Sequence, residues 1–93
     1  DPEHIVATVA EVYGIPVGQI MGRGRTKSVA RSRQIAMYLI REETDYSLPQ
    51  IGEALGGKDH TTVMYGHEKI SDLLETDDKT RRQILEIKEK LYS

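Results

Sequence analysis

Residues 52–59 carry the clearest pattern for enzyme chemistry, because GEALGGKD matches the first seven positions of the phosphate-loop motif G-x-x-x-x-G-K-[ST]. Asp59 stands where that motif needs the hydroxyl that holds Mg²⁺, and its negative charge would repel a triphosphate. The preceding segment also has helical spacing where the motif needs a strand. The sequence therefore argues against a nucleotide-binding loop.

The histidines offer no better case for catalysis. His4, His60 and His67 include no pair at i, i+4 spacing, so the HExxH metal pattern is absent. Asp59, His60 and Thr61 combine an acid, an imidazole and a hydroxyl, but three consecutive residues at a helix start cannot converge on one reacting atom. We expect His67 to be a boundary residue of its helix. We predict a protein that is not an enzyme, with no metal, no cofactor and no small-molecule substrate.

The charge of the chain is unevenly distributed. Its 93 residues hold 13 Lys+Arg and 15 Asp+Glu, yet residues 22–41 contain six basic residues and no acidic one. The remaining 73 residues hold 7 basic and 15 acidic residues, so one stretch is strongly polarised. Such a stretch is either an ordinary solvated face or a surface that binds an anionic partner.

Length and composition predict one small domain over residues 1–93. The absence of cysteine excludes disulfides and Cys-based zinc sites, and fits a reducing compartment. No apolar run approaches the roughly 20 residues that a membrane span needs, and nothing resembles a signal peptide. Because the chain does not begin with Met, we expect a fragment of a longer protein.

Apolar spacing and capping residues predict an all-α fold of five or six helices. The expected helices begin at Asp1, after Pro16, at Ser28, Ser47 and Asp59, and near residues 76–78. Gly14 is expected to end the first helix, and Ser47 with Gln50 forms a capping box of the S-x-x-Q type. The inward-facing residues include Val17, Ile20 and Met21 in the second helix and Ile84, Leu85, Ile87 and Leu91 in the last.

Residues from about 47 to 74 have the form of a helix-turn-helix, with a short helix, a Gly-containing turn and a longer helix. Five polar residues occupy the start of the second helix, where a recognition helix meets base edges: Lys58, Asp59, His60, Thr61 and Thr62. Alternatively, the Thr pair merely fills a first helical turn. Helix-turn-helix geometry also occurs in proteins that do not bind DNA, so a protein-interaction module that docks an acidic partner stays an alternative.

The basic stretch supplies the other two parts that a DNA-binding module needs. Its helical portion carries Arg31, Arg33, Gln34 and Arg41, whose side chains suit phosphate contact without reading sequence. The loop at about 22–28 could enter a narrow, A/T-rich minor groove, where negative potential is concentrated.

Three stretches together resemble the C-terminal DNA-binding domain of bacterial replication initiators of the DnaA family. They are SVARSRQIAM at 28–37, SLPQIG at 47–52 and GGKDHTTV at 56–63. The resemblance implies a Trp-repressor-like all-α bundle whose helix-turn-helix recognises short, asymmetric A/T-rich boxes in the replication origin. It implies double-stranded DNA as the partner, one domain on each box, and a place in the bacterial cytoplasm at the nucleoid. ATP binding would belong to another part of the full-length initiator.

The resemblance also implies roles for individual residues. It places the minor-groove contact at Arg25 and base readout at Lys58, Asp59, His60, Thr61 and Thr62. The expected phosphate contacts are Arg23, Lys27, Arg33, Gln34, Arg41, Leu48, Pro49, Tyr65 and Lys69. Lys58 departs from the common Arg and exchanges a bidentate fork for a point charge. Ser32 replaces a common Pro, and Tyr65 replaces a His found in some relatives.

Overall fold

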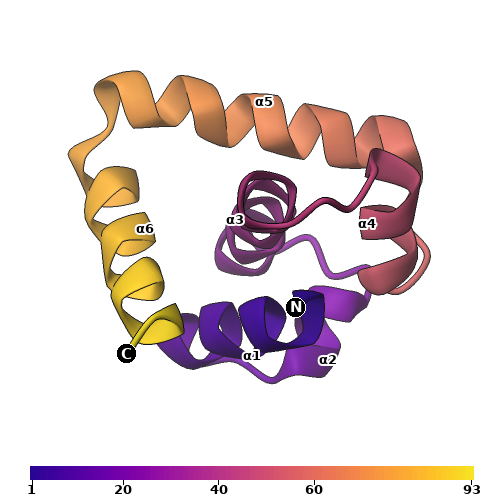
Figure 1. The fold of residues 1–93 in the computed structure, drawn as a ribbon, viewed down its shortest axis with the longest axis horizontal. Helices are drawn as coiled ribbons and strands as arrows, with labels where there is room; N and C mark the ends of the chain where they lie inside the picture. Colours follow the sequence, from indigo (N-terminus) through magenta and orange to yellow (C-terminus); the bar gives the residue numbers. More distant parts are fainter.

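A computed structural model describes all residues 1–93, which form six α-helices and no strand. The helices are α1 Pro2–Tyr13, α2 Val17–Met21, α3 Lys27–Glu43, α4 Leu48–Ala54, α5 His60–Thr76 and α6 Asp78–Leu91. Figure 1 looks down α3, which runs through the middle of the molecule while the other five helices surround it. None of the helices combines the length and apolar character that crossing a membrane requires. The all-α prediction is confirmed.

Side-chain caps fix most helix boundaries where the sequence predicts them. Asp1 accepts the N–H of His4 at 2.9 Å, and Gly14 ends α1 in the left-handed conformation with φ 67°. The capping box at the start of α4 is formed, because Ser47 Oγ accepts from Gln50 N and Gln50 Oε1 accepts from Ser47 N. The start of α3 differs from the prediction at Ser28: the first helical bond, from Ala30 N to Thr26 O, makes Thr26 the N-cap.

The central position of α3 follows from the width of its buried face. Ile35, Ala36 and Met37 are consecutive and all buried. Because successive residues of an α-helix are about 100° apart, these three side chains alone cover more than half of its circumference. The core that they join also contains Val9, Ile20, Ile51, Leu55, Val63, Ile70 and Ile87, from or next to the five surrounding helices.

Two apolar residues that were predicted to face inward lie at the surface. Val17 is 43% exposed, because the five-residue α2 reaches the core through Ile20, which is fully buried. Leu85 is 60% exposed, because α6 is anchored by Ile84 and Ile87 and Leu85 lies about 100° around the helix from Ile84. The predictions that Val17 and Leu85 face inward were wrong, because about one buried apolar residue for each turn is enough to pack these two helices against the core.

Candidate nucleic-acid interface

The turn between α4 and α5 is built around close backbone contacts. The carbonyl of Gly52 accepts the N–H groups of Gly57 at 3.0 Å and Lys58 at 2.8 Å. A Cβ atom added to Gly52 would lie 2.0 Å from the carbonyl oxygen of Lys58, so only glycine fits. Gly56 and Gly57 both have φ 84°, a conformation that glycine adopts readily. These contacts fix the start of α5 relative to α4, as the helix-turn-helix prediction requires.

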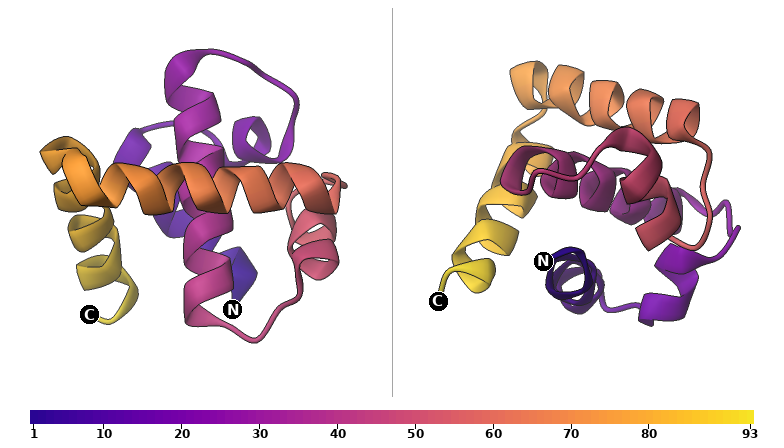
Figure 2. Two further views of the ribbon diagram at one scale, coloured as in Figure 1. Left: turned by 90° about the horizontal axis from the view of Figure 1, so that it is seen from above. Right: turned by 45° about the vertical axis from the view of Figure 1, so that its right-hand side comes forward.

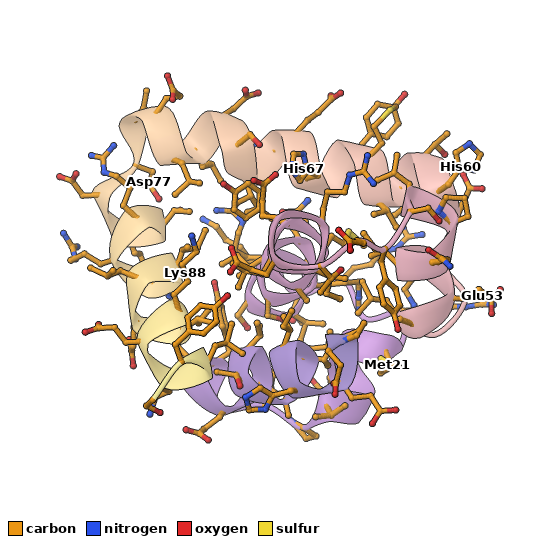
Figure 3. All side chains as sticks on the ribbon, viewed as in Figure 1. Met21, Glu53, His60, His67, Asp77 and Lys88 are labelled. Atoms are coloured by element: carbon orange, nitrogen blue, oxygen red, sulfur yellow. The ribbon has the colours of Figure 1, made fainter.

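The first turn of α5 presents short polar side chains on a rigid backbone. Asp59 is the N-cap, and its carboxylate accepts from both the backbone N–H and the hydroxyl of Thr61. These two hydrogen bonds lower the pKa of Asp59, with the Thr61 hydroxyl the largest cause. His60 Nδ1 lies 3.4 Å from the Asp59 carboxylate. Asp59, His60 and Thr62 are exposed, and Figure 3 shows His60 pointing outward at the N-terminal end of α5.

Lys58 and Arg33 turn toward α2. Arg33 donates through Nε to the Ile20 carbonyl at 2.7 Å, through Nη2 to the Gln19 carbonyl at 2.7 Å and through Nη1 to the Gly24 carbonyl at 3.0 Å. Lys58 Nζ donates to the Met21 carbonyl at 2.8 Å. Burial lowers the pKa of both groups, and the charges of Arg33 and Arg23 lower that of Lys58 further. Two N–H groups remain on each cation for another partner.

The other cations of the basic stretch have fewer internal contacts. Arg23, Arg25 and Lys27 are exposed, and none forms a hydrogen bond or ion pair through its side chain with the rest of the chain. Arg41 is also exposed and donates to the Tyr46 carbonyl at 3.1 Å, just before the start of α4. These side chains keep most of their donors for an external anion.

A shallow groove of about 230 Å³ separates α3 from α5 and brings several predicted contact residues together. Arg33 and Gln34 line it from α3, and Thr62 and Tyr65 line it from α5. Tyr65 is 64% exposed, so its phenol group is accessible from outside. Three further predicted residues lie outside this groove: Leu48 and Pro49 at the start of α4, and exposed Lys69 farther along α5.

His67 closes the middle of α5 onto α3. Its Nε2 lies 2.8 Å from a carboxylate oxygen of Glu42, and its ring stacks on Tyr38 with the ring centroids 5.0 Å apart. In Figure 3 the side chain of His67 lies between the two helices. The prediction of a boundary histidine is confirmed, and His67 has a structural role.

Sequence reasoning missed the acceptors of this region, which are the backbone carbonyls of Gln19, Ile20, Met21 and Gly24. Every residue has a backbone carbonyl, so residue type does not show which carbonyl accepts a side-chain hydrogen bond. One available signal is that α2 has no basic residue in its last turn, although its final carbonyls need donors from elsewhere.

An all-α bundle with a tight glycine turn and a polar first turn on its longer helix defines a helix-turn-helix domain. Residues 2–70 match the family model described as the bacterial dnaA protein helix-turn-helix. The chain therefore belongs to the DnaA helix-turn-helix family, and the resemblance inferred from the sequence is confirmed.

Similar proteins agree with this placement. The chain is 48% identical over 92 residues to the chromosomal replication initiator protein DnaA of Roseiflexus castenholzii, which is 99% of this chain and 19% of that protein. It is 50% identical over 90 residues to the DnaA protein of Herpetosiphon aurantiacus, covering 97% of this chain and 19% of that protein. It is 51% identical over 89 residues to the DnaA protein of Chloroflexus aggregans, covering 96% of this chain and 19% of that protein. The chain thus spans about one fifth of these curated relatives.

Proposed function

We propose that this domain binds double-stranded DNA at short, asymmetric A/T-rich boxes of a bacterial replication origin, with one domain on each box. The observation that carries the proposal is an exposed polar first turn of α5, held by the glycine turn and flanked by unpaired cations, in a member of the DnaA helix-turn-helix family. The domain contributes DNA recognition to a replication initiator at the nucleoid, without catalysis or a cofactor of its own. ATP binding belongs to the remainder of such an initiator.

In this proposal α5 enters the major groove with its first turn against the base edges. Asp59 uses one carboxylate oxygen for the cap and offers the other to the N4 amino group of cytosine. His60 and Thr62 are exposed beside it, and a Thr methyl group suits the C5 methyl of thymine. Thr61 and Lys58 complete the base-reading set, Lys58 through the two N–H groups that Met21 leaves free.

The exposed loop between α2 and α3 serves the minor groove. Arg25 inserts into a narrow A/T-rich segment, where its charge meets the strongest negative potential. Arg23 and Lys27 lie on either side of Arg25 in sequence and contact the phosphates that border the groove.

Phosphate contacts from the helices orient the domain on the duplex. Arg33 and Gln34 reach one strand from α3, and Tyr65 and Lys69 approach the backbone from α5. Arg41 lies near the start of α4, so that it contacts phosphate together with Leu48 and Pro49. These contacts supply affinity and register without reading sequence.

A titration with three ligands tests the proposal. A labelled duplex carrying an A/T-rich box selected from random sequence by this domain is compared with a scrambled duplex and an acidic peptide, at two salt concentrations. We expect the box to bind at least about a thousandfold more tightly than the scrambled duplex, with affinity that falls steeply with salt. Equal binding to both duplexes would contradict sequence-specific recognition. Preference for the peptide would instead support the rival function, a module that docks an acidic protein.

A further inference from the structure

The C-terminal end of α2 is satisfied by side chains from other elements. This five-residue helix ends at Met21, and Gly22 follows it without providing a side-chain cap. Because the last carbonyls of a helix lack partners within the helix, they need donors from elsewhere. Arg33 of α3 serves the carbonyls of Gln19 and Ile20, and Lys58 of the helix-turn-helix serves the carbonyl of Met21. Both donors are cations, which the negative end of a helix favours.

The same carbonyl of Met21 also touches the backbone of the helix-turn-helix. A Cβ atom added to Gly56 would lie 2.2 Å from the Met21 oxygen, so the turn and the end of α2 are in direct contact. The turn between α4 and α5 therefore meets the segment that leads into the basic loop. In Figure 2 the thin segment between α2 and α3 runs along the same side of the molecule as the N-terminal end of α5.

Apart from these contacts the basic loop has little to hold it. Residues 23–27 are all exposed, and the carbonyl of Gly24 accepts from Arg33 Nη1 at 3.0 Å. The same guanidinium thus binds both ends of the segment that runs from α2 into the loop. The hydrogen bonds to the carbonyls of Ile20 and Met21 are partly buried, which limits competition from water, whereas the bond to the Gly24 carbonyl is exposed.

We propose that Arg33 and Lys58 are positioning residues that fasten the basic loop to the turn of the helix-turn-helix. The loop and the first turn of α5 are thereby presented as one rigid unit with a fixed distance between them. Building on the proposed function, this fixes the spacing in base pairs that a box must have between its minor-groove and major-groove elements. Either cation can still give its remaining N–H groups to DNA, so the two roles are compatible.

Proteolysis of the DNA-free domain tests the fastening without reference to DNA. Lys58→Met keeps the aliphatic stem and removes the donor to Met21. Lys79→Met is the matched control, because Lys79 is an exposed lysine on α6 that donates to no backbone carbonyl and lies outside the proposed DNA contacts. We expect trypsin cleavage after Arg23 and Arg25 to accelerate about tenfold in Lys58→Met, because a charge-assisted hydrogen bond is lost from the closed state. Lys58→Arg should restore the slow rate.

Unchanged cleavage in Lys58→Met, at an unchanged melting temperature, would overturn the proposal. Arg33→Met is a second variant with the same expected direction and a larger effect, because it removes three hydrogen bonds. A uniform rise in cleavage at sites all over the domain would indicate global unfolding. That pattern in both variants would also count against a local fastening.

A spacing experiment tests the consequence for recognition. One base pair inserted between the two elements of the selected box moves them apart by about 3.4 Å and rotates one about the duplex axis. We expect the insertion to weaken wild-type and Lys79→Met binding by about a hundredfold, and Lys58→Met binding by only about tenfold, because a loosened loop can follow the displaced element. Equal insertion penalties in all three proteins would contradict a fixed spacing. If the wild type shows no preference for the box, the proposed function fails, and proteolysis alone decides whether the two cations hold the loop.

Discussion

The first turn of α5 and the loop at residues 22–26 differ in how their polar groups are held. The α5 turn carries short side chains whose positions are set by the helix and by the cap at Asp59. The loop carries long cationic side chains that have no internal partners, on a backbone that Arg33 holds at the Gly24 carbonyl and that begins next to Met21, the acceptor of Lys58. Short side chains on a fixed backbone suit base reading, and long cations suit attraction to phosphate and groove potential. In the proposed function, the α5 turn therefore reads bases in the major groove, and the loop supplies positive charge to the minor groove and its phosphates.

The largest expected effect comes from breaking the support of the α5 turn. Gly52→Ala would place a Cβ atom 2.0 Å from the Lys58 carbonyl, so the backbone of the turn must move. We expect a loss of about 3 kcal/mol of unfolding free energy or more. Gly18→Ala is the matched control, because a Cβ atom there meets nothing within 4 Å and α2 should become slightly more stable. Chemical denaturation measures both, and equal effects would contradict the close-approach argument.

Arg25→Ala tests the proposed role of the loop in the minor groove. The loss of a minor-groove cation should weaken binding to the selected box by about 1 to 3 kcal/mol and flatten the base preference at its A/T-rich end. Recognition at the base pairs read by α5 should be unchanged. Binding to a set of single-base-pair variants of the box measures both effects. Uniform weakening with an unchanged preference would instead make Arg25 a phosphate contact.

Arg41→Ala should lower the affinity for DNA without changing the preference for particular base sequences. Loss of one phosphate contact reduces the log–log slope of affinity against salt by about 0.9 and lowers binding to the box and to scrambled DNA by similar factors. A salt titration of both duplexes provides the measurement. A change in the ranking of box variants at an unchanged salt slope would show that Arg41 reads sequence.

The smallest expected effects come from substituting two aspartates, at opposite ends of α5, that are both N-caps of helices. Asp59 caps α5 and Asp77 caps α6, each accepting from a Thr hydroxyl and backbone N–H. Figure 3 shows His60, next to Asp59, and Asp77 at the two ends of α5. Asn caps about as well as Asp, so both Asp→Asn variants should retain neutral-pH stability. Only Asp59→Asn should change DNA binding, with about tenfold less discrimination at one C·G pair and slightly tighter scrambled binding. Equal effects of the two variants on DNA binding would leave Asp59 as a cap only.

Asp59 and Asp77 should affect the pH dependence of folding stability in the same way. Hydrogen bonds from Thr61 and Thr80 lower the pKa values of Asp59 and Asp77 in the folded state. Each carboxylate therefore contributes stability above the ordinary Asp pKa of about 3.9, and this contribution is lost as the pH falls through the lowered folded value. Thermal unfolding between neutral pH and about pH 3 should show a shallower acid limb in either Asn variant than in the wild type.

Local signals in the sequence predicted most of the fold. Asp1, Ser47 and Asp59 mark helix starts because a cap needs only a side chain and the backbone a few residues away. The same reasoning failed for Val17 and Leu85, since which flank of a short amphipathic helix is covered depends on neighbouring helices.

The candidate site was predictable in outline and not in its internal contacts. The residue types at 58–62 and the charge of residues 22–41 are visible in the sequence. The hydrogen bond from Lys58 to the Met21 carbonyl joins residues 37 positions apart. Nothing in either residue type announces it, because every residue carries a backbone carbonyl.

Where α5 crosses α3 at Gly66, the packing protects a buried methionine from oxidation, so the oxidation rate of that residue reports on the opening of the crossing. A Cβ atom on Gly66 would lie 2.4 Å from the sulfur of Met37, and Met37 is only 1% exposed. Methionine oxidation adds an oxygen atom to that sulfur and makes it polar, which the closed crossing has no room to accept. Met21 and Met64 are partly exposed and can react with peroxide in the native state. The rate at which peroxide oxidises Met37, compared with the rates for Met21 and Met64, therefore measures how often α3 and α5 separate.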